Sequence, residues 1–562
     1  MDSKRFILLI ALGLVSTMIW QTWQEDYGPA PAPTELSQQS RSEPAPAADA
    51  NGQPAVDQEA ADIPSMPESQ TQTPSASTVT QTTGEMIRVT TDIYDIAIDT
   101  RGGTLSEVRL PQYPVSVNKP DQPYVMLTDD ASPLYYVAQG GLLSKAQAPS
   151  HKALYQTEKT RYALSEGADT LEVVLSWQSD DGVTVNKIYT FHSGQYQIDV
   201  RYEVNNQSNS SWRGWAYSQL QRNNPDSDGS LFLYTYTGAA LSSPEDRYRK
   251  LDFGDIRDQK LEKEISNGWA AMLQHYFVSA LVPADADDSY RYYTSVINRD
   301  SNDPRYVIGS TTPAVDIAPG NQGTLSQRFF IGPKLQHRMD KVAPGLELTV
   351  DYGIFWLLAK PLFWGLEKFH ALTGNWGWAI ILLTLLIKVV FYRLSAAGYR
   401  SMARMRKVQP RLLALRERYK DDKQKLNQAM MDLYKTEKIN PLGGCFPILV
   451  QIPVFISLYW VLLESVELRQ APFILWINDL SIPDPFFVLP LIMGVTMFVQ
   501  QKLNPAPIDP VQEKIMMTLP VVFTVFFAFF PAGLVLYWVV NNILSIAQQW
   551  LITRNLEKSG EN

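Results

Sequence analysis

Residues 376–392 decide the fold class, and they read WGWAIILLTLLIKVVFY. This run approaches the roughly 20 apolar residues that a helix needs to cross a bilayer. Four more such runs follow, at about 446–463, 486–501, 516–530 and 532–551. The mean hydropathy of −0.16 is nevertheless too low for a chain that lies wholly in lipid. The 562 residues therefore combine a membrane part with a large soluble part.

The soluble part is expected between residues 86 and 340, where the apolar pattern changes to a period of two. The alternating side chains of one strand are Val183, Val185, Lys187, Tyr189 and Phe191. A second strand alternates over 196–204, after a turn at His192-Ser193-Gly194. Short strands with frequent turns predict a sandwich of antiparallel sheets. We interpret Trp212 and Trp215 as core or interface residues in preference to the walls of a sugar or peptide cleft.

The first 85 residues divide into an anchor and a linker. Lys4 and Arg5 precede an apolar stretch over 6–20, which fits either a cleaved signal peptide or an uncleaved helix. We favour an uncleaved anchor over 1–24, because Pro33 follows the small-residue site at 30–32 and would hinder cleavage. Residues 25–85 are rich in Pro, Ala, Ser, Gln and Thr, which predicts a disordered linker.

Two further helical segments surround the first span. Residues 341–375 are expected to hold an amphipathic helix that lies in the membrane interface, with Lys360 and Glu367 opposite its apolar side. Residues 394–440 are expected to form a helical hairpin that is bent or interrupted at Pro410 and turns at Asp421-Asp422. Its apolar seam comprises Met405, Val408, Leu412, Leu415, Tyr419, Leu426, Met430 and Leu433.

The hairpin also fixes the expected orientation. Residues 393–438 hold thirteen Lys and Arg but five acids. The excess of Lys and Arg places this loop in the cytoplasm, and the β-rich part on the other side of the membrane. The N-terminus and the C-terminus are then both cytoplasmic. The basic hairpin is either a solvated loop or a platform for a nascent chain or ribosomal RNA, and the residues alone favour neither.

The sequence offers no sign of covalent chemistry. It lacks the G-x-S-x-G, H-E-x-x-H, P-loop and G-x-G-x-x-G motifs. One cysteine excludes an internal disulfide, and none of the five histidines pairs at metal-ligand spacing. A net charge of −9 argues against general nucleic-acid binding. We therefore expect a protein that is not an enzyme and that holds neither a metal nor another cofactor.

Lys388 is the residue that the membrane part singles out. It interrupts an apolar run, where a central, lipid-facing lysine costs about 2.5–3.5 kcal/mol. It could snorkel to the nearby cytoplasmic interface. We favour a shared polar cavity, because other spans also carry polar groups, namely Thr384, Gln451, Thr496, Gln500, Thr524, Asn541 and Asn542.

Several runs along nearly the whole chain resemble the YidC membrane protein insertases of Gram-negative bacteria. They include 99–103 (DTRGG), 348–353 (LTVDYG), 374–377 (GNWG), 440–445 (NPLGGC), 465–473 (SVELRQAPF) and 533–537 (GLVLY). The resemblance implies five core helices over 376–393 and 441–562, with a groove open to cytoplasm and lipid. It also implies a periplasmic β-supersandwich of the galactose-mutarotase type over 86–340.

The same resemblance assigns roles to residues. Lys388 matches the cationic groove position, which is usually Arg, and Thr384 lies one turn before it. Gln451 resembles the groove glutamine, Ile452 and Pro453 match contact positions, and Tyr537 and Trp538 match the substrate-contacting aromatic pair. The implied partners are nascent membrane proteins, the Sec translocon, lipids, and ribosome or targeting factors at the hairpin.

Two other functions remain open from the residues alone. A small-solute transporter would also place polar groups between broken helices, but it usually shows repeated halves, and this sequence shows none. A membrane-anchored periplasmic chaperone or ligand-binding protein would place the function in the β-rich part. Deletion of roughly residues 90–320 distinguishes them, because a chaperone would lose all activity whereas an insertase would keep most of it.

Overall fold

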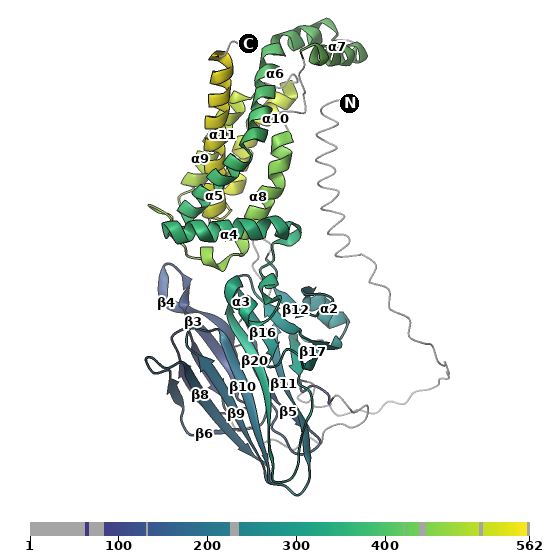
Figure 1. The fold of residues 1–562 in the computed structure, drawn as a ribbon, viewed down its shortest axis with the longest axis vertical. Helices are drawn as coiled ribbons and strands as arrows, with labels where there is room; N and C mark the ends of the chain where they lie inside the picture. The colour runs from purple at the N-terminus through teal and green to yellow at the C-terminus, as the bar shows by residue number, and fades with distance from the viewer. Residues whose placement is uncertain are drawn as a thin grey trace, which may run out of the picture. The chain divides into compact units, whose positions relative to one another are not determined.

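The computed structural model describes residues 62–66, 84–130, 133–224, 235–420, 422–437, 446–504 and 510–558. The chain divides into two compact units, Met1–Val56 and Asp57–Asn562. The predicted anchor at 1–24, and the predicted linker apart from 62–66 and 84–85, lie outside the described residues. The described residues all belong to the second unit, whose strands and helices are labelled in Figure 1.

The β-rich part is built from two sheets. The first runs in the order β14-β17-β18-β11-β5-β4-β3-β2-β1-β7, with β19 paired to β11. Its strands are β1 (Met86–Thr90), β2 (Asp95–Asp99), β3 (Thr104–Ser116), β4 (Lys119–Thr128), β5 (Tyr136–Ser144), β7 (Arg161–Ala163), β11 (Trp212–Asn223), β14 (Glu262–Ser266), β17 (Ser289–Ile297), β18 (Arg305–Thr311) and β19 (Val315–Ile317).

The second sheet runs in the order β13-β12-β15-β16-β20-β10-β9-β8-β6. Its strands are β6 (Gln156–Thr157), β8 (Thr170–Gln178), β9 (Val183–His192), β10 (Gln197–Asn206), β12 (Gly238–Ser242), β13 (Arg249–Leu251), β15 (Trp269–Leu273), β16 (Phe277–Pro283) and β20 (Gln322–Pro333). The predicted all-β sandwich is thus confirmed. Trp212 and Trp215 are buried, as their interpretation as core residues required.

The hairpin predicted from the period-two pattern is β9–β10. All five alternating side chains of β9 are buried. Gly194 adopts a φ of +66° in the turn, a conformation that favours glycine. Phe191 then pairs with Ile198 and Tyr189 with Val200, which places both apolar rows on the same face of the sheet.

Helices follow the sandwich. They are α3 (Gln336–Val342), α4 (Trp356–Thr373), α5 (Trp376–Val390), α6 (Tyr392–Arg418), α7 (Lys423–Thr436), α8 (Phe446–Glu464), α9 (Val488–Leu503), α10 (Pro510–Phe527) and α11 (Ala532–Lys558). Short 3₁₀ turns, η2 (Leu346–Thr349), η3 (Gly353–Phe355) and η4 (Val466–Leu468), join some of them, and α2 (Phe253–Asp258) lies within the β-rich part. Helix α11 contacts α5, α6 and α9, whereas α4 packs on α5 and α8.

The motif at 374–377 shows how the sequence sets the start of α5. Gly374 ends α4 with a φ of +65°, and the Asn375 side chain accepts a hydrogen bond from Trp378 N at 3.2 Å. The Asn375 amide also donates to Pro472 O and Phe473 O, both at 3.1 Å. A Cβ at Gly377 would lie 2.0 Å from the Phe473 ring, so this position requires glycine.

Of the bend or interruption expected at Pro410, the structure excludes the interruption. Helix α6 continues through Pro410 without interruption, although its seam does pack on α7, with Val408 and Leu412 beside Met430 and Leu433. In α4, Phe363 is buried, because that side of the helix faces its neighbouring helices.

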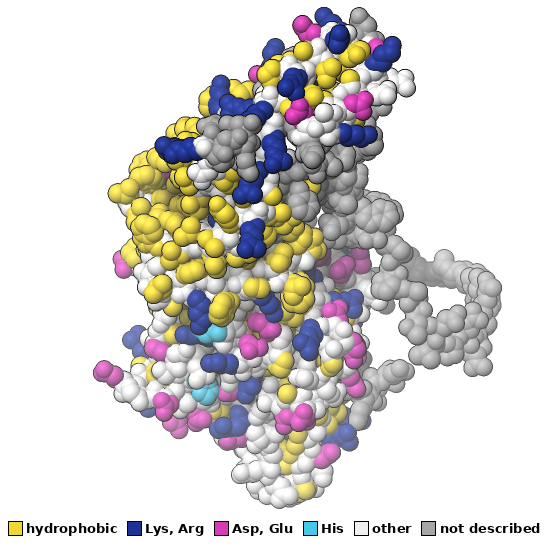
Figure 2. Space-filling model, turned by 45° about the horizontal axis from the view of Figure 1, so that its top comes forward, with side chains coloured by type: hydrophobic (Ala, Val, Ile, Leu, Met, Phe, Trp, Pro, Cys, Tyr) yellow, Lys and Arg dark blue, Asp and Glu magenta, His cyan; other side chains and the backbone are white. Residues whose placement is uncertain are grey.

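Large hydrophobic side chains remain exposed on the helical part, and Figure 2 shows them as a broad patch with Lys and Arg above it. They include Leu385, Leu386, Val389 and Val390 on α5, Leu491 and Val495 on α9, and Val521, Val522 and Val525 on α10. Within the described residues, no single helix qualifies as a membrane span by length and composition. Helices α5 and α6 qualify as a pair bent by 68°.

Candidate functional site

Lys388 lies on the last turn of α5 and points across to α11. Its side chain is buried, with 7% relative exposure, and Nζ donates a hydrogen bond to Ser545 Oγ at 2.6 Å. Ser545 in turn donates to Asn541 O at 2.7 Å, which leaves its oxygen lone pairs for the ammonium. The side chain therefore runs to a neighbouring helix and does not extend along α5 to the helix end.

Few described groups offset the free-energy cost of burying the Lys388 ammonium. Among the described residues, no carboxylate lies within ion-pair distance of Lys388 Nζ, and Ser545 supplies its one hydrogen-bond acceptor. An ammonium carries three N–H donors, and a buried donor without a partner costs about 1–3 kcal/mol. Lys388 is thus a cation suited to an additional polar or anionic partner.

A cavity of about 290 Å³ with both polar and apolar walls adjoins this contact. It lies between α6, α8, α9 and α11 and is lined by Ser395, Gly398, Tyr399, Met402, Gln451, Ile452, Phe455, Met497, Gln500, Gln501, Asn504, Tyr537, Trp538, Asn541, Asn542 and Ser545. Ser545 therefore belongs both to the cavity wall and to the Lys388 contact. Amide and hydroxyl groups on all four helices can replace water around a polar chain that enters.

The aromatic pair forms one wall of the cavity. Phe455 lies 6.1 Å from Tyr537 and 4.8 Å from Trp538 between ring centroids. The Trp538 indole also lies 5.4 Å from the ring of Phe527. Its buried N–H has no hydrogen-bond partner among the described residues. The wall thus offers an apolar, aromatic surface.

Four of the seven predicted site residues line the cavity directly, namely Gln451, Ile452, Tyr537 and Trp538. Lys388 reaches it through Ser545. Thr384 is fully buried and donates to Ile380 O at 2.7 Å on its own helix, so it does not face the cavity. Pro453 lies within α8, where its carbonyl accepts a hydrogen bond from Ser457 at 2.7 Å.

The sequence analysis missed Ser545, Ser395, Tyr399 and Asn504. A helical stripe on α11 does indicate Ser545, because Trp538, Asn541, Asn542, Ser545 and Gln549 recur at spacings of three and four. Along this stripe Asn542 Nδ2 donates to Thr496 Oγ1 at 3.3 Å, and Gln549 Nε2 donates to Leu503 O at 3.1 Å. The polar residues of α9 and α11 therefore meet, as a shared cavity requires.

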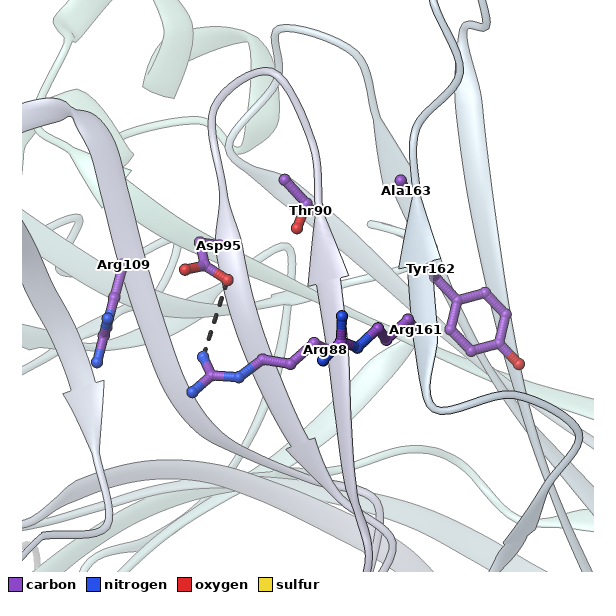
Figure 3. A pocket seen from close by; sticks show the side chains of 7 residues that line it. All are labelled: Arg88, Thr90, Asp95, Arg109, Arg161, Tyr162 and Ala163. Atoms are coloured by element: carbon purple, nitrogen blue, oxygen red, sulfur yellow. Dashed lines mark ion pairs between the residues drawn. The ribbon is translucent and has the colours of Figure 1, made fainter.

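A second concavity, of about 420 Å³, lies on the first sheet (Figure 3). It contains Arg88, Arg109 and Arg161 beside Asp95 and Tyr162. Arg88 Nη1 lies 2.9 Å from Glu107 Oε2 and 3.8 Å from Asp95 Oδ1, and Arg109 also pairs with Glu107. These carboxylates offset much of the arginine charge, so we do not assign the concavity as a site.

Comparison with known proteins covers the whole chain. A family model described as the YidC periplasmic domain matches residues 86–365, and one described as the 60Kd inner membrane protein matches residues 368–559. The membrane protein insertase YidC of Thioalkalivibrio sulfidiphilus is 51% identical, with 100% of both chains covered. That of Methylococcus capsulatus is 50% identical, with 100% of this chain and 99% of the relative covered.

Solved structures are more distant. An active YidC insertase with its first transmembrane domain resolved is 19% identical, with a TM-score of 0.38, and the match covers 83% of this chain and 94% of that one. A galactose mutarotase related enzyme from Lactobacillus acidophilus is 11% identical, with a TM-score of 0.31, and the match covers 44% of this chain and 97% of that one.

Proposed function

The chain belongs to the YidC family of membrane protein insertases, and we propose that it inserts its substrates through the cavity between α6, α8, α9 and α11, with Lys388 as the anchoring cation. As a member of this family it is a protein of the bacterial inner membrane with a periplasmic domain, and its substrates are membrane proteins. Insertion is not an enzymatic reaction, so the site must act by binding.

The observation that carries the proposal is the contact between Lys388 and Ser545 at the cavity wall. Lys388 Nζ uses one N–H donor in this contact and keeps the others for a further partner. It does so beside a cavity that is lined by amide and hydroxyl groups. A carboxylate or a peptide carbonyl from the polar tail of a substrate would complete the hydrogen bonds of Nζ. This lowers the free energy of dehydrating the tail, which otherwise opposes its transfer across the membrane.

The apolar segment of the substrate follows a different path from the polar tail. It would contact Phe455, Tyr537 and Trp538 and then move into lipid. Burial of each large apolar side chain contributes about 1.5–3 kcal/mol. The sequence has no nucleotide-binding motif, so the proposed driving forces are this burial and the membrane potential acting on charges in the substrate.

Orientation and partners belong to the same proposal. The basic helices α6 and α7 would lie in the cytoplasm with both termini, where they would meet ribosome or targeting factors. The sandwich over 86–340 would form the periplasmic domain. The exposed apolar side chains of Ile354 in η3 and of Trp356 and Leu357 at the start of α4 would rest in the lipid headgroups. Contact with the Sec translocon would serve larger substrates.

Substitution of Lys388 tests the site. Lys388→Ala and Lys388→Met should both reduce Sec-independent insertion severalfold, because neither retains the cation. Lys388→Arg should insert nearly normally, since it keeps the charge. The Met variant preserves side-chain volume and so separates loss of charge from loss of packing. The measurement is protease protection of a small membrane protein in proteoliposomes.

Photocrosslinking from position 538 to a stalled nascent chain supplies the second readout. Crosslinks should fall within the apolar segment of the substrate and weaken in Lys388→Ala. Normal insertion by both neutral variants would remove Lys388 from the mechanism. Crosslinks that arise from the β-rich part and not from position 538 would move substrate contact out of the membrane.

A further inference from the structure

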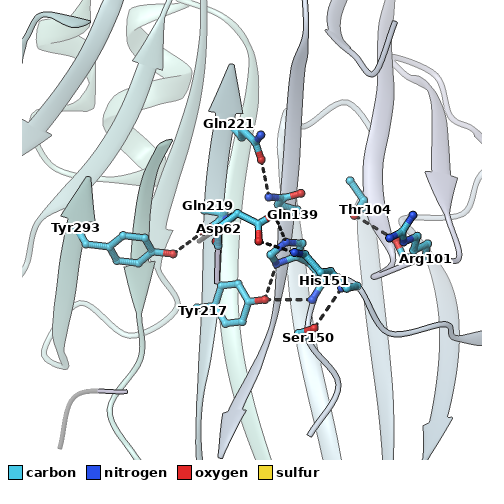
Figure 4. A network of polar contacts seen from close by, with 11 residues as sticks. Asp62, Arg101, Thr104, Gln139, Ser150, His151, Tyr217, Gln219, Gln221 and Tyr293 are labelled. Carbon is cyan, nitrogen blue, oxygen red and sulfur yellow. Dashed lines mark hydrogen bonds and ion pairs between the residues drawn. The ribbon is translucent and has the colours of Figure 1, made fainter. Parts of the chain in front are cut away.

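A short segment ahead of the β-sandwich lies against a face of its first sheet. Residues 62–66 read DIPSM, and they contact side chains from β5, β11 and β17 and from the loop after β5. Figure 4 shows Asp62 among His151, Tyr217 and Gln219. Nothing in the proposed insertion mechanism uses this contact.

The segment is held by both its side chain and its backbone. Asp62 Oδ2 lies 3.1 Å from His151 Nε2, and Asp62 Oδ1 lies 2.8 Å from Lys152 Nζ. The Asp62 carbonyl accepts from Gln219 Nε2 at 3.1 Å, and the Ser65 carbonyl accepts from Arg291. The contacts of His151 and Lys152 select for a carboxylate. The hydrogen bonds to the two carbonyls would form with any extended backbone.

The receiving residues are positioned by a buried network of their own. His151 is 5% exposed, and its Nδ1 lies 2.6 Å from Tyr217 Oη, which also accepts from His151 N. The hydroxyl proton of Tyr217 is therefore directed at Nδ1, and Nε2 carries the hydrogen that faces Asp62. Tyr293 Oη fixes the Gln219 amide by donating to its oxygen at 2.8 Å.

Electrostatics agree with this arrangement. Burial lowers the pKa of His151, although Asp62 opposes the shift, so the imidazole stays neutral at pH 7. Burial alone would raise the pKa of Asp62, but the hydrogen bond from His151 and the charge of Lys152 outweigh it and hold that pKa below its usual range. The network thus favours an ionised carboxylate at the position of Asp62.

An apolar cluster adjoins the polar network. Leu143, Trp215 and Tyr217 form a buried cluster separate from the main core, and Ile63 and Met66 pack against it. Tyr217 belongs both to the polar network and to this cluster, so the residues that bind the carboxylate are adjacent to those that contact the apolar side chains. The segment belongs to the same chain as its site, so its binding is intramolecular and needs few contacts.

We propose that this face is a binding site for extended polypeptide that presents a carboxylate followed by apolar side chains, and that Asp62–Met66 occupies it as an internal ligand. Another segment of the same chemistry would bind by displacing Asp62–Met66. The site is distinct from the membrane cavity, and failure of one proposal leaves the other intact.

Competition between internal and external peptide tests the proposal. The probe is a fluorescein-labelled peptide of residues 60–68, and the receptor is the full chain in detergent. The variant Asp62→Ala/Ile63→Ser/Met66→Ser should bind the probe at least tenfold more tightly than the wild type, because its own segment no longer competes. A probe with alanine in place of the aspartate should bind at least tenfold more weakly.

Charge reversal gives the matched control. The receptor that carries Asp62→Ala/Ile63→Ser/Met66→Ser is called the cleared receptor. In it, Lys152→Glu should weaken binding of the probe severalfold. A probe with lysine in place of the aspartate should recover part of this lost affinity. Lys159→Glu makes the same change at an exposed lysine nearby and should leave binding unchanged. The Lys152 side chain is partly exposed and Lys159 is exposed, so neither change places a charge in the core. Equal affinity of wild type and cleared receptor, or no binding to the cleared receptor, would refute the site.

Discussion

Lys187 is a lysine inside the β-sandwich, with 1% relative exposure. Its Nζ donates to three carbonyls, Gly102 O at 2.8 Å, Gly103 O at 3.0 Å and Gly140 O at 3.1 Å. These acceptors match the three donors of an ammonium. They also join the second sheet, through β9, to the turn before β3 and to β5 of the first. Lys187 therefore connects the two sheets in a way that an apolar residue could not.

Substitution of Lys187 should show this connection. Lys187→Met keeps the stem but leaves three carbonyls without their donor, so we expect it to lower the free energy of unfolding by about 3 kcal/mol. Thermal denaturation followed by tryptophan fluorescence measures the change. Lys159→Met, at an exposed site, is the control and should be neutral. An unchanged Tm for Lys187→Met would mean that water or repacking satisfies the carbonyls.

Residue patterns predicted the position of Lys187 but not its purpose. It alternates with Val185 and Tyr189, which placed it on the buried face of a strand. Its acceptors lie more than 40 residues away in sequence, and only the paired sheets bring them together. Lys388 was likewise recognisable in the sequence, because it interrupts an apolar run. The role of Ser545 as its hydrogen-bond acceptor depends on the packing of α5 beside α11.

At the scale of elements, the turn between β15 and β16 meets the end of α8. His275 Nε2 donates to Leu463 O at 2.9 Å, and burial lowers the pKa of His275 to about 4, although that hydrogen bond opposes the shift. An unfolded chain takes up this proton near pH 6.5, before the folded chain does. The stabilisation is therefore complete above about pH 6.5 and is lost as the pH falls toward 4.

The size of this effect can be measured by substitution. A shift of about 2.5 pKa units corresponds to a loss on the order of 3 kcal/mol between pH 6.5 and 4. His275→Gln keeps an N–H donor and should lose less stability over the same range. Tm measured at several pH values compares the two, with His337→Gln at an exposed histidine as the control. Parallel pH profiles for wild type and His275→Gln would contradict the assignment.

Elements differed in how far the sequence could predict them. Strands β9 and β10 were predicted with their shared turn, because alternation and a glycine determine a local hairpin. The neighbour of β10 on its other side is β20, which pairs through residues 322–330, over a hundred residues later. No local pattern encodes that pairing. Helix α6 contains Pro410 and packs its seam on α7, so of the bend or interruption expected at this proline the structure excludes the interruption.

At the scale of the whole molecule, the sandwich and the helices contact each other through the 465–473 loop. Arg469 Nη2 and Gln470 Nε2 both donate to Pro114 O at 2.7 Å. Arg469 also lies over the rings of Tyr124 and Phe277, at 5.7 and 5.6 Å. The loop in turn receives the two hydrogen bonds from Asn375 at the start of α5. A continuous set of contacts thus runs from the sheet to the helix that carries Lys388.

Deletion of the sandwich tests whether insertion depends on that set of contacts. Replacement of residues 86–333 by a short flexible linker should retain most insertion of a small Sec-independent substrate, because every residue of the proposed cavity lies beyond position 390. The deletion must stop there, since Gln336 donates to Tyr352 at 2.5 Å and Tyr352 lies 6.3 Å from the ring of Phe363. A deletion through residue 352 removes this support for α4 and should lower accumulation of the protein. If the shorter deletion accumulates normally but inserts nothing, the function resides in the β-rich part, as the chaperone alternative requires.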